Sequence, residues 1–311
     1  MTLQQLHYIL AVDEHRHFAQ AAKACNVTQS TLSSMIQKLE AELDVIIFDR
    51  KSQPVKPTGL GKKLIDQAKI ILYHTSQMEE IVRLEKDEDA GDIRLGILSN
   101  IAPYILPQLF KRINKAAPKL KLEASELRSV ELLDKLHRAE LDMAILTTPV
   151  VCDNLIEIPL YVEDFYAYIS PNEQAQCGVP SKEGEDDNNQ PTFSYHQQDL
   201  CPKNNKAVAL GTAQSLFNTA YEEGNTDTLV RIVDANGGYT MIPELHISLL
   251  KRCQKKNIYP LTNPKQRREV ALYVRTDFVK ERLLNIIIEQ IKNIIPDNML
   301  NERLTKFKVR L

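Results

Sequence analysis

Glycine is scarce in this chain of 311 residues, and long apolar runs are missing. Only 10 glycines, with 43% hydrophobic and 26% charged residues, exclude a low-complexity chain and allow real cores. No apolar run approaches a membrane span, and residues 1–18 carry charge too early for a signal peptide. A net charge of −2 argues against a partner bound by overall charge alone. We therefore expect a cytoplasmic protein of two or three domains without membrane contact.

Paired cysteines are also missing. The five cysteines are odd in number and scattered, with no CxxC pair and no metal-ligand spacing. This distribution argues against a secreted disulfide framework and against a structural zinc site. We expect no metal and no cofactor. The cysteines are Cys25, Cys152, Cys177, Cys201 and Cys253.

The first 58 residues have the spacing of a small helical domain. Apolar residues at near-helical intervals predict a helix over 3–13, and an alanine-rich stretch predicts a second helix over 18–25. Thr28 suits the N-cap of a third helix, because its hydroxyl can accept a backbone N–H. The third helix has one apolar stripe, made of Leu32, Ile36, Leu39 and Leu43.

The other face of the third helix carries short polar side chains. The major groove of DNA admits one helix, and hydroxyl and amide groups near the helix start can reach base edges. Residues 45–61 predict a hairpin wing, whose Lys51 and other basic residues suit phosphates. The predicted DNA contacts are Thr28, Gln29, Ser30, Thr31, Ser33, Ser34, Gln37, Lys38, Arg50, Lys56 and Thr58.

This pattern predicts a winged helix-turn-helix. Residues 1–58 hold six basic and six acidic residues, so binding must depend on local placement of charge. The alternative is an ordinary helical subdomain whose polar face is only solvated.

A long helix is predicted from Leu60 to about Asp87. Its apolar residues repeat at helical intervals along one side, and a long helix of this kind commonly pairs with a copy of itself. The predicted pairing seam comprises Leu64, Ile65, Ala68, Leu72, Ile81 and Val82.

Strands and helices alternate beyond residue 90, which is typical of a parallel α/β sheet. The stretch GNTDTLVRIVDANGGYTMIPE predicts a helix–turn–strand unit inside a second lobe. The expected strands are 93–98, 120–126, 141–146 and 269–275, and the expected helices are 103–116, 129–139 and 278–294.

The stretch FAQAAKACNVTQSTLSSMIQKLEAELDVIIFDR, followed by PTGLG, resembles the N-terminal domain of LysR-type transcriptional regulators. Ser30 departs from the family, which usually has proline there, and Ser34 stands where a long basic side chain is common. The matching positions are Phe18, Ala21, Ala22, Val27, Thr28, Gln29, Leu32, Ser33, Ile36, Leu39, Glu40, Leu43, Phe48, Arg50, Thr58 and Gly61.

The resemblance covers the whole chain and implies its architecture. It implies a winged helix-turn-helix over 1–58, a linker and dimerisation helix over 59–90, and an effector-binding domain over 91–311. The effector domain is expected to be a two-lobed, periplasmic-binding-protein-like α/β fold. Lobe I would comprise 91–162 and 268–295, and lobe II would comprise 163–267.

The resemblance also implies partners. These are double-stranded operator or promoter DNA, a small-molecule effector of unknown identity and RNA polymerase. The chain would assemble as a homodimer or homotetramer.

The sequence is similar to the peroxide-sensing OxyR branch of this family, which uses two cysteines nine positions apart. Cys201 fits the first position, but Leu210 occupies the second. Leu200 replaces a histidine, and Asn100 replaces a threonine that helps to bind peroxide. Three readings stay open for Cys201: an inert thiol in a loop, a thiol activated by Lys203 or Lys206, or one resolved by Cys177 or Cys253.

Ligands of two-lobed α/β domains bind between the lobes, beside strand ends. Hydroxyl, amide and backbone N–H donors there predict a small polar or anionic effector. Thr147 and Thr148 can equally be turn residues. The effector candidates are Ser99, Asn100, Thr147, Thr148 and Cys201, with the turn at 236–238.

An enzyme is the contrasting class of protein. Cys201 paired with His196 or His246 is imaginable as a nucleophile and base, but no catalytic sequence context surrounds these residues. We expect no catalytic residue.

Overall fold

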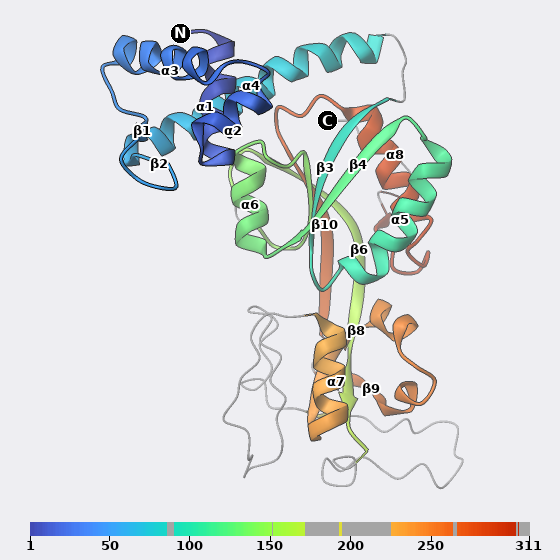
Figure 1. The fold of residues 1–311 in the computed structure, drawn as a ribbon. Helices are drawn as coiled ribbons and strands as arrows, with labels where there is room; N and C mark the ends of the chain where they lie inside the picture. Colours follow the sequence, from blue (N-terminus) through green and yellow to red (C-terminus); the bar gives the residue numbers. More distant parts are fainter. Residues whose placement is uncertain are drawn as a thin grey trace, which may run out of the picture.

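The computed structural model describes residues 1–85, 90–150, 152–171, 193–194, 225–263, 266–302 and 304. A long helix, α4 (Gly59–Glu85), connects a small helical N-terminal domain to an α/β effector domain (Figure 1). Within the described ranges, no helix has the length and apolar character needed to cross a membrane.

The N-terminal domain contains three helices and a two-stranded wing. Thr2 and Gln5 form a capping box at the start of α1. The apolar stripe of the third helix is confirmed for Leu32, Ile36 and Leu39, but it is wrong for Leu43, which is 39% exposed because the helix ends there. The elements are α1 (Leu3–His15), α2 (Phe18–Ala24), α3 (Gln29–Leu43), β1 (Phe48–Asp49) and β2 (Lys56–Pro57).

Helix α4 starts within the core of the N-terminal domain. Ile65 and Ala68 are each 1% exposed there, and they pack in the same cluster as the apolar residues of α1. The predicted pairing seam is therefore wrong for these two residues, because the chain buries them against its own first helix. The apolar side chains that α4 leaves exposed are Leu60, Ile71, Met78, Ile81 and Val82.

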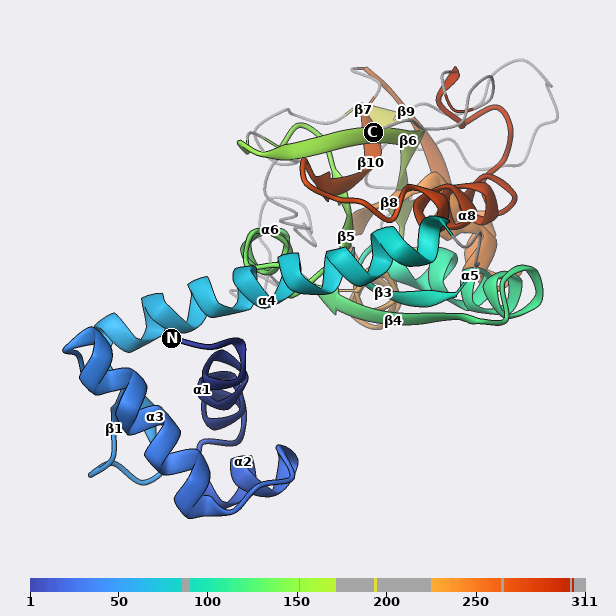
Figure 2. The same cartoon turned by 90° about the horizontal axis from the view of Figure 1, so that it is seen from above.

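The middle of α4 lies along the effector domain, beside helix α6 (Ser129–His137) (Figure 2). Lys69 Nζ lies 2.6 Å from Glu140 Oε1, and Arg138 lies 3.5 Å from Asp66. These ion pairs hold the linker helix to the end of α6.

The described part of the effector domain contains an eight-stranded sheet in the order β4-β3-β5-β10-β6-β9-β7, with β8 paired to β6. Helices α5 and α8 pack together on one side of the first strands, and α6 lies on the other side (Figure 1). The strands are β3 (Gly91–Leu98), β4 (Leu120–Leu127), β5 (Met143–Thr147), β6 (Leu155–Ile169), β7 (Phe193–Ser194), β8 (Tyr239–Pro243), β9 (Ile258–Asn263) and β10 (Arg267–Arg275). The remaining helices are α5 (Ala102–Ala116), α7 (Thr226–Asn236), α8 (Glu281–Lys292), η2 (Glu244–Leu249) and η3 (Gln254–Asn257).

The sheet is mixed, whereas the sequence predicted a parallel one. β3 pairs in parallel with β4 and β5, as expected, but β10 runs antiparallel to both β5 and β6. The prediction was wrong for β10 because this strand returns the chain from the second lobe. The long strand β6 leads the chain out to that lobe (Figure 1).

The predicted helix–turn–strand unit of the second lobe is present as α7, two glycines and β8. Asn225 caps α7 by accepting a hydrogen bond from the Asp227 amide. Gly237 and Gly238 have φ values of 84° and 90°, which L side chains rarely adopt. The two glycines therefore allow the turn that brings β8 back onto β6.

Candidate DNA-binding face and inter-lobe cleft

The start of α3 is built from hydroxyl groups. Thr28 is the N-cap, as predicted, and its Oγ1 accepts a hydrogen bond from the Thr31 amide at 3.2 Å. The same oxygen lies 2.9 Å from Ser30 Oγ and 2.8 Å from Thr31 Oγ1. The three hydroxyls are thus tied together, while Gln29 beside them is exposed and makes no such bond within the described residues.

The exposed face of α3 presents most of the predicted DNA contacts. Gln29, Ser34, Gln37 and Lys38 are all exposed. Ser33 is half-buried, and its Oγ accepts a hydrogen bond from Arg50 Nη1 at 3.1 Å. The amide and hydroxyl side chains on this face are able to donate to and accept from base edges.

Arg50 of the wing is engaged within the protein. Its guanidinium lies 2.9 Å from Glu40 Oε2 and 5.1 Å from the centre of the Phe18 ring. Glu40 Oε1 in turn accepts the backbone N–H groups of Ile47 and Phe48. Arg50 therefore links three parts of the domain: α2, α3 and the wing.

The side chains of two further predicted DNA contacts, Lys56 and Thr58, differ in whether they already bond within the protein. Lys56 is exposed on β2, and its ammonium has no partner within the described residues. Thr58 Oγ1 instead donates to the Ile46 carbonyl at 2.7 Å and accepts the Gly61 amide at 2.9 Å. The sequence did not predict that Thr58 fastens the start of α4 to the segment between α3 and β1.

The predicted effector residues lie at two strand ends of lobe I. Ser99 and Asn100 directly follow β3, Thr147 ends β5, and Thr148 follows it. Thr148 Oγ1 lies 3.3 Å from Glu269 Oε2 on β10. Cys201, with Cys177, Leu200 and Leu210, lies outside the described residues, as do Lys203, Lys206 and His196.

Beside Asn100 is a buried polar cluster that the sequence did not predict. Glu163 on β6 is 1% exposed and Arg268 on β10 is 8% exposed, and Arg268 Nε lies 2.7 Å from Glu163 Oε1. Arg268 also donates to the Tyr104 hydroxyl and, at 3.4 Å, to the Asn100 carbonyl. Glu163 Oε2 accepts the Leu245 amide at 3.1 Å. The cluster thus joins β6, β10, α5 and η2 where the chain passes between the lobes.

Electrostatics fixes the charge of this cluster. Burial opposes the charge of Arg268, but the adjacent Glu163 carboxylate outweighs it and raises the pKa of the guanidinium. Burial raises the pKa of the Tyr104 and Tyr161 hydroxyls, so both stay protonated. Burial also lowers the pKa of His246, so its ring is neutral near pH 7.

Several buried atoms around the cluster have no hydrogen-bond partner. Among the described residues these include Asn100 Oδ1, the Tyr161 hydroxyl and both ring nitrogens of His246. His246 Nε2 lies 3.4 Å from Asp227 Oδ1. Unpaired buried polar groups cost free energy, so they mark a place where a polar ligand would be favourable.

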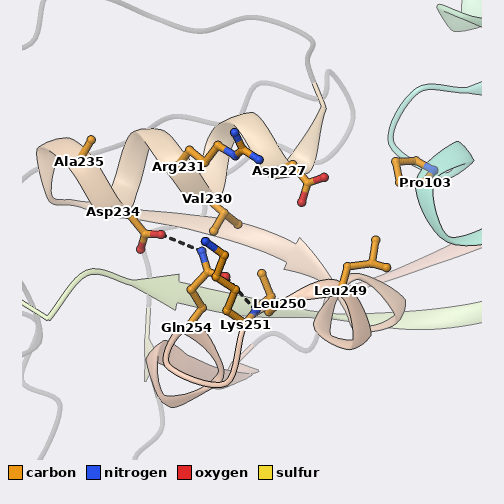
Figure 3. Close-up of a pocket in the computed structure, with 10 residues that line it drawn as sticks. All are labelled: Pro103, Asp227, Val230, Arg231, Asp234, Ala235, Leu249, Leu250, Lys251 and Gln254. Carbon is orange, nitrogen blue, oxygen red and sulfur yellow. Dashed lines mark hydrogen bonds between the residues drawn. The ribbon is translucent and has the colours of Figure 1, made fainter.

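A pocket of about 610 Å³ opens in lobe II between α7 and the segment that follows η2 (Figure 3). Arg231 and Lys251 supply positive charge, and Asp234 accepts a hydrogen bond from Gln254 at 2.8 Å. Pro103 of α5 forms its edge next to Tyr104. Ser99, Asn100, Thr147 and Thr148 do not line it. In the described part of the chain, no group of three or more His, Cys, Asp or Glu side chains is placed to hold a metal ion.

Two protein-family descriptions match this chain. Residues 3–62 match the bacterial regulatory helix-turn-helix protein of the lysR family, and residues 86–294 match the LysR substrate binding domain. The chain therefore belongs to the LysR family of transcriptional regulators. It is a DNA-binding regulator and not an enzyme, which confirms the winged helix-turn-helix prediction over the ordinary helical subdomain.

Known proteins are similar to this chain along nearly its whole length. A hydrogen peroxide-inducible genes activator of Haemophilus influenzae is 30% identical over 301 residues, which is 95% of this chain and 99% of that protein. The regulator EstR of Acinetobacter baylyi is 28% identical over 295 residues, or 94% of this chain and 97% of that one. A structure of a full-length OxyR variant from Pseudomonas aeruginosa superposes with a TM-score of 0.71 at 25% identity, covering 97% and 98% of the two chains.

Proposed function

We propose that the chain binds operator DNA through the exposed face of α3 and that an effector held between the lobes controls its activity as a transcriptional regulator. The observation that carries the first part is that Gln29, Ser34 and Gln37 are exposed on a helix whose opposite side is buried. A helix presented in this way fits the major groove. Such a regulator acts where the chromosome is, which supports a location in the cytoplasm.

Two substitutions separate base reading from phosphate binding. Gln29→Ala removes an amide that reaches base edges, so we expect a loss of about 1–3 kcal/mol for the operator and relaxed preference at one base position. Lys56→Ala removes a free ammonium, so we expect weaker binding to every sequence and a salt slope smaller by about one. Fluorescence anisotropy with operator and scrambled duplexes at several salt concentrations measures both effects. Equal losses on operator and scrambled DNA for Gln29→Ala would contradict the proposed orientation of α3.

Control from the cleft is supported by the unpaired atoms around Arg268 and Glu163. The effector candidates remain Ser99, Asn100, Thr147 and Thr148, and to these we add Tyr161 and His246. We expect a small polar or anionic ligand, because hydroxyl, amide and imidazole groups surround the site. The test is promoter output in cells: Asn100→Ala should alter transcription while DNA occupancy measured by chromatin capture stays unchanged. Unaltered transcription at every occupied promoter would argue against this site.

A peroxide response through Cys201 is the second candidate. It is supported by the name of the Haemophilus influenzae relative, but Leu210 stands where a second cysteine would be required. We therefore expect no intramolecular disulfide at Cys201 after peroxide treatment. Mass spectrometry of thiol-blocked protein, with Cys201→Ser in a reporter assay, measures this. A disulfide from Cys201 to Cys177 or Cys253, lost together with the response in Cys201→Ser, would establish the second candidate.

The exposed side of α4 supports assembly of the chain into a homodimer. Ile71, Met78, Ile81 and Val82 form an apolar surface that a second copy of the helix would cover. A homodimer would place two α3 helices in successive major grooves about 34 Å apart, or a multiple of that distance. Pairing of two dimers would give a homotetramer, which would present its effector domains to RNA polymerase beside the promoter.

A further inference from the structure

A cysteine–histidine pair lies at the end of α6, away from the DNA-binding face. Cys152 follows β5 in the chain, and its Sγ lies 2.8 Å from Nε2 of His137, the last residue of α6. Both side chains are half-buried, so solvent molecules reach them. The pair combines a nucleophile with a base at hydrogen-bonding distance.

The backbone that carries His137 is fixed by an arginine of β10. The His137 carbonyl accepts a hydrogen bond from Arg275 Nη1 at 2.8 Å. Arg275 is fixed in turn by Asp277, whose carboxylate oxygens lie 2.8 and 2.6 Å from Nε and Nη2. The residue that carries the base is therefore fixed at the end of α6, and its ring contacts the Cys152 thiol.

The other described cysteines lack this arrangement. Burial raises the pKa of the Cys25 thiol, which makes it a poorer nucleophile. Cys253 is exposed. For neither of them do the described residues supply an imidazole at hydrogen-bonding distance.

We propose that Cys152 is a hydroperoxide-reactive thiol and that His137 is its base. His137 takes the thiol proton, and the thiolate attacks one oxygen of the hydroperoxide. The S–O bond forms as the O–O bond breaks, and the imidazolium returns its proton to the departing oxygen. Hydrogen peroxide thus oxidises Cys152 by two electrons to a sulfenic acid and is itself reduced to water. The step uses neither Cys201 nor the cleft between the lobes.

The pair adjoins the contact between the effector domain and the linker helix. Arg138, the residue after His137, pairs with Asp66 of α4, and the Arg275 guanidinium lies 5.1 Å from the centre of the Tyr73 ring on α4. Oxidation replaces the thiol that His137 contacts with a larger, polar sulfenic acid. The chemical change therefore occurs beside the groups that hold α4, which carries the DNA-binding domain.

The test traps sulfenic acid on the full-length protein. The protein is treated with hydrogen peroxide and a dimedone-type reagent, and mass spectrometry follows the label on each cysteine peptide over time. We expect Cys152 to be labelled faster than Cys25 and Cys253. His137→Gln should slow its labelling roughly tenfold at pH 7, because an unactivated thiol is only a few per cent thiolate there. His15→Gln, in the DNA-binding domain, is the matched control and should leave the rate unchanged.

A pH series distinguishes a base from a structural residue. Above the pKa of a free thiol, about 8.5, the thiolate forms without help, so the wild-type and His137→Gln rates should converge near pH 10. Rates that differ equally at pH 7 and pH 10 would contradict the role of His137. Labelling of Cys152 no faster than that of Cys25 and Cys253 would overturn the proposal.

Discussion

Gly61 lies where the segment before the wing meets α4, and the backbone there leaves no room for a side chain. A Cβ at Gly61 would lie 2.0 Å from the Ile47 carbonyl oxygen, a distance that real contacts do not show. Gly61→Ala should therefore lower the free energy of unfolding by about 1–3 kcal/mol, because backbone must shift to make room. Urea unfolding followed by circular dichroism measures the change.

The matched control is Gly59, two residues earlier on the same helix. A Cβ there meets nothing within 4 Å. Gly59→Ala should leave stability unchanged or raise it by up to about 1 kcal/mol, because alanine favours the helix. Equal losses for both variants would show that the junction does not require glycine.

The role of a single residue was predictable from the sequence where its hydrogen-bond partner lies a few residues away along the chain. Thr28 was assigned as an N-cap because its hydroxyl acts three residues along the chain, and the structure confirms that bond. The Glu163–Arg268 pair was not predicted, because 105 residues separate its members and nothing local marks either of them. Thr58 was predicted to contact DNA, and that contact stays a prediction. Its hydrogen bonds to the Ile46 carbonyl and the Gly61 amide were not predicted, because they depend on how the chain turns before α4.

At the scale of elements, the contact of α4 with α6 should respond to pH. Burial raises the pKa of Glu140, but hydrogen bonds from Lys69 and Lys135 outweigh it and lower the pKa below the usual 4.5. A lowered folded-state pKa contributes stability that is present above pH 4.5 and is lost as the pH falls through the folded value. The protection factors of the α4 amides against hydrogen exchange should therefore fall below about pH 4.5. Glu140→Gln should remove this dependence, and an unchanged pH profile in that variant would contradict the account.

The exposed side of α4 should determine assembly. Met78 is 68% exposed on the apolar surface described above. Met78→Glu would place a charge in the proposed dimer interface, so we expect monomers that bind DNA weakly. Glu79→Gln, at the adjacent exposed position, is the control and should stay assembled. Sedimentation velocity distinguishes the two results, and an unaltered oligomer in Met78→Glu would contradict this surface.

Helical periodicity predicted that α4 exists, but it did not predict which segments pack against each of its faces. The seam read from the sequence mixed Ile65 and Ala68, which pack on α1, with Ile81 and Val82, which are exposed. Both sets are apolar, and spacing alone does not tell which face meets the same chain and which meets another copy. Strand direction was missed for a related reason: β10 has the apolar pattern of a buried strand, whichever way it runs.

At the scale of the whole molecule, the DNA-binding and effector domains are connected through one helix (Figure 2). Ion pairs from Asp66 and Lys69 fix α4 to the effector domain, and its first turns belong to the core of the DNA-binding domain. A change at the end of α6 therefore has a direct physical route through α4 to the DNA-binding domain. The family match was foreseeable from the helix-turn-helix stretch, whereas this route depends on contacts between distant segments.

The central claim is that α3 reads DNA sequence, and selection from a random pool of DNA duplexes tests it most directly. The wild-type protein should enrich a two-fold symmetric sequence whose half-sites are about 34 Å apart, or a multiple of that distance. Gln29→Ala should enrich the same sequence with one position in each half-site relaxed. Enrichment of no defined sequence, or of an identical sequence by the Gln29→Ala variant, would contradict the account.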